Sequence, residues 1–180
     1  HTNMLGISSV DGAGGVVFTN PTAGAAQATD PPDVAAPGRR GLGFLETAGN
    51  VVGAVTANPQ GMALMTWSFA GNTFTLANAA VLLDLLPSFV TSAARASGGF
   101  QPVIVASVAE GKINVYDGTD ILNFTGGAEV MPRRAYTGLV LPLSGFRLKP
   151  RRDGTSAYFI TAQSPPQVCR ISLQAGTGGP

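Results

Sequence analysis

The sequence is poor in the side chains that most enzymes and metal sites use. It has a single histidine, His1, and a single cysteine, Cys169, in 180 residues. One cysteine cannot form an intramolecular disulfide or a cysteine-based metal cluster. A Ser-His-Asp or Cys-His arrangement needs a positioned imidazole, and a terminal residue is a poor platform for one. The composition therefore predicts a protein that is not an enzyme and binds neither a metal ion nor a cofactor.

Charged residues are also scarce, at 12% of the chain, which is about half the usual share for a soluble domain. A monomer needs surface charge to stay solvated and apart from its neighbours. We therefore expect copies of the chain or other protein subunits to cover much of its surface. The net charge of +1 gives no overall field towards nucleic acid or a membrane. The longest apolar stretch, residues 76–90, is too short and too interrupted to span a bilayer.

The few carboxylates allow two further kinds of site. Paired carboxylates could serve a glycosidase, and Asp117 and Asp120 could donate oxygens to a calcium ion. However, most of the ten acidic residues stand beside glycine or proline, which is typical of turns. Two carboxylates in one loop are also too few for a calcium site. We therefore interpret Asp117 and Asp120 as turn residues and rank a carboxylate hydrolase last.

Short apolar runs separated by turn signals recur along the chain. A hairpin is predicted over residues 42–57 around Gly49-Asn50, and a strand over 62–69 with a return strand from Thr73. Further strands are predicted at residues 16–18, 103–108, 112–116, 136–143, 146–148, 157–161 and 168–173. Short strands at near-regular spacing favour a mainly β fold, a single antiparallel β-sandwich or barrel.

Two segments depart from this strand pattern. Residues 78–96 are predicted to be helical, because Asn78 and Ser88 can each cap a helical turn. Residues 20–41 hold four prolines and read as a long extended segment. We therefore divide the chain into an extended arm with one short strand, residues 1–41, and a single β domain, residues 42–180.

Three arginine pairs are the candidate interface residues, and each stands in a loop rich in proline or glycine. Arginine suits packed interfaces because its planar fork pairs bidentately and is weakly hydrated. The alternative is solvated loop charge, paired weakly with nearby acids such as Glu129 and Asp153. We expect the pairs to contact neighbouring subunits, because nucleic-acid binding would need aromatic residues among the charges. The candidates are Arg39, Arg40, Arg133, Arg134, Arg151 and Arg152.

The whole chain resembles the small β-rich accessory proteins of tailed-phage virions, such as capsid decoration (cement) proteins and fibre or baseplate domains. The resemblance lies in composition and architecture: much Gly, Ala, Thr and Pro, little charge or Lys, an extended N-terminal segment, and a glycine-rich C-terminus at Gly176, Gly178 and Gly179. It implies a non-enzymatic role in the virion. The partners would be further copies of the chain, often as a trimer, and other structural subunits.

The competing interpretation is a carbohydrate- or receptor-binding β-sandwich, exposed at a cell or virion surface or outside the cell. Aromatic faces suit the C–H surfaces of sugar rings. The residues that could stack on such a ligand are Trp67, Tyr116, Tyr136 and Tyr158.

Overall fold

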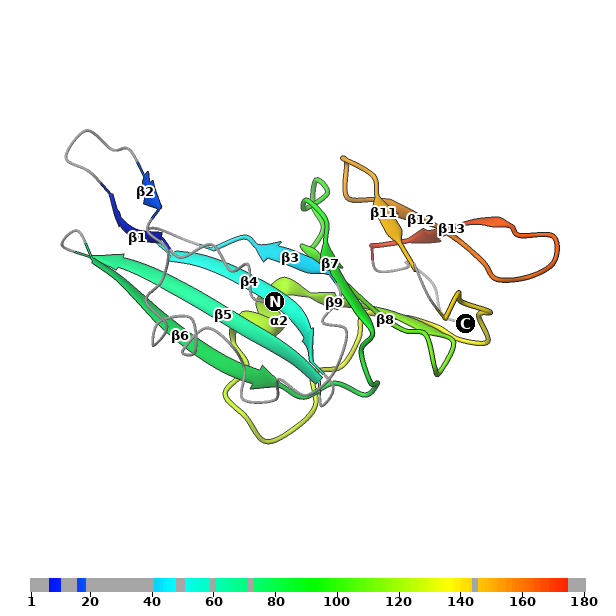
Figure 1. Cartoon of the computed structure of the whole chain (residues 1–180), viewed down its shortest axis with the longest axis horizontal. Coiled ribbons are helices and arrows are strands. Elements are labelled where there is room, and N and C mark those ends of the chain that lie inside the picture. The colour runs from blue at the N-terminus through cyan, green and yellow to red at the C-terminus, as the bar shows by residue number, and fades with distance from the viewer. Residues whose placement is uncertain are drawn as a thin grey trace.

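The fold is that of a computed structural model, which describes residues 7–10, 16–18, 41–47, 51–58, 61–70, 73–143 and 146–174. It confirms a mainly β fold in which every paired strand is antiparallel to its neighbour (Figure 1). None of the helices in these ranges is of a length and apolar character that would cross a membrane.

The first of the larger sheets is a four-stranded meander in which each strand pairs with the next along the chain. The predicted hairpin over residues 42–57 and the predicted strand over 62–69 with its return from Thr73 are all confirmed. Alternation along the third of these strands places Met62 and Leu64 on a buried face. The strands are β3 (Leu42–Leu45), β4 (Val51–Asn58), β5 (Gly61–Ala70) and β6 (Thr73–Val81).

The remaining strands form a central sheet, a C-terminal sheet and a short N-terminal hairpin. The central sheet has the order β10-β9-β8-β7, and the C-terminal sheet has the order β11-β12-β13. The central strands are β7 (Phe89–Ser92), β8 (Pro102–Ser107), β9 (Lys112–Asp117) and β10 (Arg134–Tyr136). The others are β11 (Leu148–Pro150), β12 (Ser156–Ile160), β13 (Val168–Ser172), β1 (Ile7–Val10) and β2 (Val16–Phe18).

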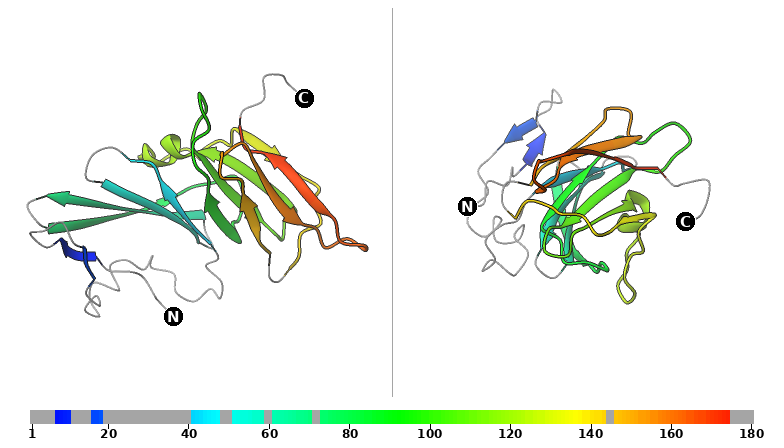
Figure 2. Two further views of the ribbon diagram at one scale, coloured as in Figure 1. Left: turned by 90° about the horizontal axis from the view of Figure 1, so that it is seen from above. Right: turned by 90° about the vertical axis from the view of Figure 1, so that its right-hand side faces the viewer.

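The central sheet is buried on both faces, because it lies between the other two large sheets (Figure 2). Val103 and Val105 of β8 point towards the β3–β6 meander and belong to one hydrophobic cluster. Ile104 and Ala106 alternate with them and belong to a second cluster beneath the C-terminal sheet. All six residues of β8 are buried. The β-branched run at residues 103–108 therefore forms the predicted strand, and this strand has a hydrophobic core on each face.

Polar contacts fix the edge at which the meander meets the central sheet. The side-chain amide of Gln101 donates to the carbonyl oxygen of Phe44 at 2.9 Å and accepts from the backbone N–H of Glu46 at 2.7 Å. The Ser92 hydroxyl donates to the same Phe44 oxygen at 2.7 Å. Gln101 is buried, so the backbone groups that it pairs would otherwise lack partners away from water.

The helix predicted over residues 78–96 is wrong. Residues 73–81 form β6, and Leu83 bridges to Val130 before β7 begins. From Val81 to Pro87 buried residues alternate with more exposed ones, a period of two that belongs to extended chain. Burial of every second residue against the central sheet outweighs the helix propensity of the Ala- and Leu-rich segment.

A short helix lies instead where the sequence indicated a turn. It is α2 (Gly118–Leu122), and it follows β9 directly. The Asp117 carboxylate accepts from the backbone N–H of Thr119 at 2.9 Å and so caps the helix. Asn123 ends it with its backbone N–H bonded to carbonyl oxygens of the preceding turn.

Other boundaries also differ from the sequence-based expectation. The strand predicted over residues 136–143 is shorter and earlier, because Gly138 has a φ of 69° and turns the chain after β10. The strand predicted over 146–148 is β11, which is shifted towards the C-terminus. The arm predicted over residues 1–41 contains two described strands, β1 and β2, and the proline-rich residues 20–40 lie outside the described residues.

Gly154 sets how closely the β11–β12 hairpin approaches the segment before β8. Its φ is +67°, and a Cβ added there would meet the carbonyl oxygen of Ala94. We expect Gly154→Ala to lower the free energy of unfolding by about 3 kcal/mol or more, since it combines a disfavoured backbone conformation with a backbone clash. Urea denaturation measures the change.

Gly98 provides the matched control for this prediction. Its φ is +72°, but a Cβ there would meet nothing within 4 Å. Gly98→Ala should cost only about 1 kcal/mol, the intrinsic penalty of the left-handed conformation. Equal losses for the two variants would show that the Gly154 contact with Ala94 is not tight in solution.

Candidate functional site

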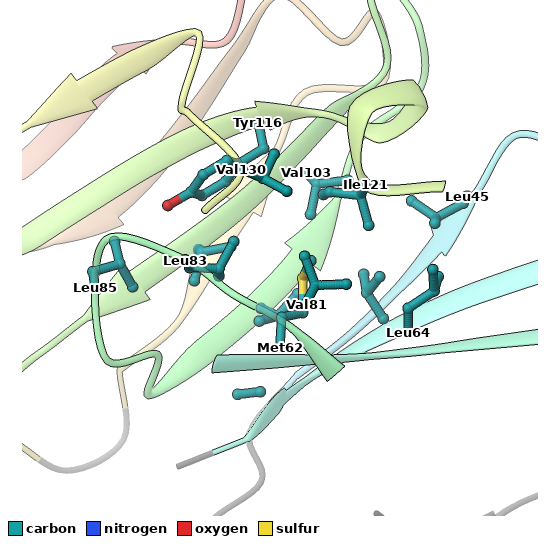
Figure 3. Close-up of a cluster of buried hydrophobic side chains, with 14 residues drawn as sticks. Leu45, Met62, Leu64, Val81, Leu83, Leu85, Val103, Tyr116, Ile121 and Val130 are labelled. Carbon is teal, nitrogen blue, oxygen red and sulfur yellow. The ribbon is translucent and has the colours of Figure 1, made fainter. Parts of the chain in front are cut away.

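A buried polar cluster joins β9 to the segment that follows β6. Asp84 Oδ1 accepts from the Tyr116 hydroxyl at 2.6 Å and from Asn114 Nδ2 at 2.7 Å. Asn114 and Tyr116 are both fully buried, and the Tyr116 ring lies among apolar side chains that include Leu83 and Val130 (Figure 3).

In this cluster the Tyr116 hydroxyl keeps its proton and donates it to the Asp84 carboxylate in a hydrogen bond. Burial and the hydrogen bond to Asp84 raise the pKa of Tyr116 far above its usual range. The phenol therefore stays protonated and donates to the carboxylate. The proposal that Tyr116 stacks on a ligand is wrong, because the ring is fully buried and has no face open to a sugar.

Arg133 is paired within the chain. Its Nη2 lies 2.9 Å from Asp120 Oδ2 and 3.6 Å from Asp117 Oδ2. The guanidinium thus pairs with both carboxylates that the sequence offered as calcium ligands, and Asp117 also caps α2. Within the described residues, no three His, Cys, Asp or Glu side chains come close enough together to hold a metal ion.

Arg134 and Tyr136 connect the central sheet to the C-terminal sheet. Arg134 Nε donates to the carbonyl oxygen of Gln174 at 2.6 Å. The Tyr136 hydroxyl donates to the carbonyl oxygen of Ser172 at 2.8 Å and accepts from the Ser172 N–H at 3.0 Å. These side chains are committed to contacts inside the subunit, which leaves them poorly suited to the interface and ligand-stacking roles that the sequence suggested.

The third arginine pair splits into one paired and one unpaired side chain. Arg151 Nη2 lies 3.0 Å from Asp153 Oδ2. Hydrogen bonds from Thr155, together with the Arg151 charge, lower the pKa of Asp153 below its usual value. Arg152 is exposed and makes no ion pair or hydrogen bond within the described residues. Arg39 and Arg40 lie outside the described residues, so the structure does not bear on them.

The two remaining stacking candidates stand in different sheets. Trp67 is a residue of β5 whose side chain is not described, so its role stays a prediction. Tyr158 lies on the outer face of β12, where it is 37% exposed. Cross-strand pairing places Tyr158 opposite Lys149 of β11 and opposite Arg170 of β13. The three side chains form a row across the outer face of the C-terminal sheet.

The two cations of this row were not among the predicted site residues, although the sequence carries a signal for them. Residues 130–180 contain seven basic residues and one acidic residue, a net charge of +6. Residues 1–129 contain four basic and nine acidic residues, a net charge of −5. The overall value of +1 hides this polarity, and counting charge along the chain would have located the basic part.

Comparisons of the chain with models of protein families, with curated proteins and with solved structures found no match. The site is therefore interpreted from its own geometry.

The Asp84–Tyr116 contact makes a prediction about pH. Because folding raises the Tyr116 pKa, the contact stabilises the fold below the unfolded-state tyrosine pKa of about 10, and this stabilisation is lost as the pH rises above it. Tyr116→Phe should lower the free energy of unfolding by about 2 kcal/mol at neutral pH. The difference between wild type and variant should shrink above pH of about 10, as measured by urea denaturation across pH. A stability difference that stays constant with pH would contradict a stabilising hydrogen bond from Tyr116 to Asp84.

Proposed function

We propose that the protein is a non-enzymatic structural component of a symmetric assembly, which acts through contacts between subunits. The observation that carries the proposal is a surface with little charge and many exposed, large apolar side chains. Phe44 on β3 is 60% exposed and Leu143 is 83% exposed. Others with large exposed fractions are Leu82, Leu86, Met131 and Val140. Together with a charged fraction of 12%, these side chains favour a surface that is covered in the native state.

The exposed apolar residues lie on several parts of the molecule. Phe44 is on the edge strand of the meander, whereas Leu86 follows β6 and Leu143 follows β10. Leu143 also lines a shallow surface groove with Leu139 and Val140. A subunit that contacts several neighbours needs such separate patches, because each contact in a closed assembly uses its own surface.

The virion is the setting that we propose for this assembly. The chain shares its richness in Gly, Ala, Thr and Pro and its scarcity of Lys with the small accessory proteins of tailed-phage virions. In that setting the protein would be a capsid decoration or tail-associated component, bound to copies of itself and to other structural subunits. Burial of low-charge surface between subunits would stabilise it by mass action.

The carbohydrate-binding alternative has less support from the aromatic residues. Tyr116 is buried, and the Tyr136 hydroxyl is bonded to Ser172. Among the candidates with described side chains, Tyr158 offers an exposed ring, and it stands between two cations. Cationic neighbours suit an acidic partner better than a neutral sugar, so we do not propose sugar binding.

Self-association is the measurement that tests the proposal. We expect analytical ultracentrifugation of the purified protein to show a concentration-dependent oligomer. Phe44→Ser and Leu143→Ser should each weaken association by about tenfold, because each removes an exposed apolar side chain from a contact. Neither should lower the free energy of unfolding of the subunit by more than about 0.5 kcal/mol, because both side chains are already exposed.

Phe44→Leu and Leu143→Met are the matched controls, since they keep an apolar side chain at each position. They should associate like the wild type. A wild-type protein that stays monomeric at high concentration, and binds no capsid or tail protein, would overturn the proposal.

A further inference from the structure

We infer that the outer face of the C-terminal sheet binds the acidic surface around Glu129 of a second copy of the chain, so that copies join head to tail. The inference rests on the proposed assembly function and specifies which surfaces meet. The sheet face comprises Lys149, Tyr158, Ile160, Val168 and Arg170, and is called the basic face below.

The basic face combines unpaired cations with apolar area. Lys149 and Arg170 are exposed on either side of Tyr158, and neither makes an ion pair within the described residues. In the next pair on the same face of the sheet, Ile160 lies opposite Val168, and these side chains are 55% and 73% exposed. A face with a cationic row beside an exposed aliphatic pair fits a partner that offers both acidic and apolar groups.

Two further arginines add to the charge near this face. Arg147 stands just before β11 and Arg152 stands two residues after it, and both are exposed. Asp153 is the single acidic residue after Glu129 in the sequence, and it already pairs with Arg151. The charge of the basic face is therefore left uncompensated by the C-terminal part of its own subunit.

The acidic surface on the same chain has the complementary character. Glu129 is exposed and makes no ion pair within the described residues. It lines a shallow depression of about 410 Å³ together with Asp120 and the apolar Phe124 and Met131. Arg133 lies at the same depression but is shared between Asp117 and Asp120, so the local charge stays negative.

The two surfaces lie on different sides of the molecule, so one copy cannot bring its own pair together. The loop that follows α2 runs along the lower edge in Figure 1, whereas β11, β12 and β13 lie at the opposite, upper side (Figures 1 and 2). A contact between two different surfaces is heterologous, and every copy then has one of each to offer. Such contacts close into a ring or continue as a chain, as the rotation between copies dictates.

A second copy fits the basic face better than a nucleic acid does. The first 129 residues of every copy carry a net charge of −5, which is complementary to the charge of the basic face. The exposed Ile160–Val168 pair would gain little from a phosphate backbone but can be buried against Phe124 or Met131. A single aromatic residue, Tyr158, also offers little stacking for successive bases.

Charge reversal on each surface tests the inference. Lys149→Glu/Arg170→Glu removes the basic face, and Glu129→Lys removes the acidic one. Each variant alone should weaken self-association by about tenfold or more in sedimentation velocity, more strongly at low salt than at high salt. Ser97→Glu/Thr137→Glu is the control, because it adds negative charge at exposed positions outside both surfaces and should associate like the wild type.

Mixing the two association-deficient variants gives the decisive result. In the mixture, the intact acidic surface of one variant meets the intact basic face of the other, and the two reversed surfaces are complementary to each other as well. An equimolar mixture should therefore form complexes that contain both variants in native mass spectrometry, which supports head-to-tail contact. No mixed complex, or a wild-type level of association in either variant alone, overturns the inference while the assembly function stands.

Two further outcomes separate this inference from the proposed function. If the wild type binds a single-stranded oligodeoxynucleotide, and Lys149→Glu/Arg170→Glu abolishes that binding without changing self-association, the basic face is a nucleic-acid surface and the inference is overturned. If the wild type is monomeric at every concentration, the proposed assembly function fails first and the head-to-tail contact fails with it.

Discussion

The burial of both faces of the central sheet is the constraint on which the rest of the structure depends. Strand β8 contributes Val103 and Val105 to one core and Ile104 to the other, so neither core forms unless this strand is in place. A strand that is buried at every position has no solvent-facing side to offer. It therefore requires a second layer on each face, which the meander and the C-terminal sheet supply.

Polar contacts then fix how the layers are placed, because apolar contacts alone are not directional. Gln101 pairs backbone groups of the meander edge, Asp84 accepts from Tyr116 beside the first core, and Tyr136 bonds to Ser172 beside the second. Each contact joins segments far apart in the sequence. Candidate functional residues such as Tyr116 and Tyr136 bond within the chain in this way, so contacts with a partner fall to the side chains that remain exposed.

The exposed side chains give the molecule its polarity. The C-terminal sheet presents cations next to aliphatic side chains, whereas Glu129, which makes no ion pair within the described residues, lies before it in the chain. Low overall charge and high local polarity are compatible, because the charges of the two parts nearly cancel. A net charge close to zero with segregated signs is what an assembling subunit needs, since repulsion between copies stays small while contacts remain oriented.

The sequence by itself determined the fold class and most of the strands, since alternation and turn residues are local properties. The β8–β9 hairpin, the meander and β12–β13 follow directly from such patterns. Only the tertiary structure decided that residues 78–96 are extended, because burial against a distant sheet overrides local helix propensity. It also decided that Arg133 and Tyr136 bond internally while Tyr158 lies between two cations, because strand register joins residues that no local pattern relates.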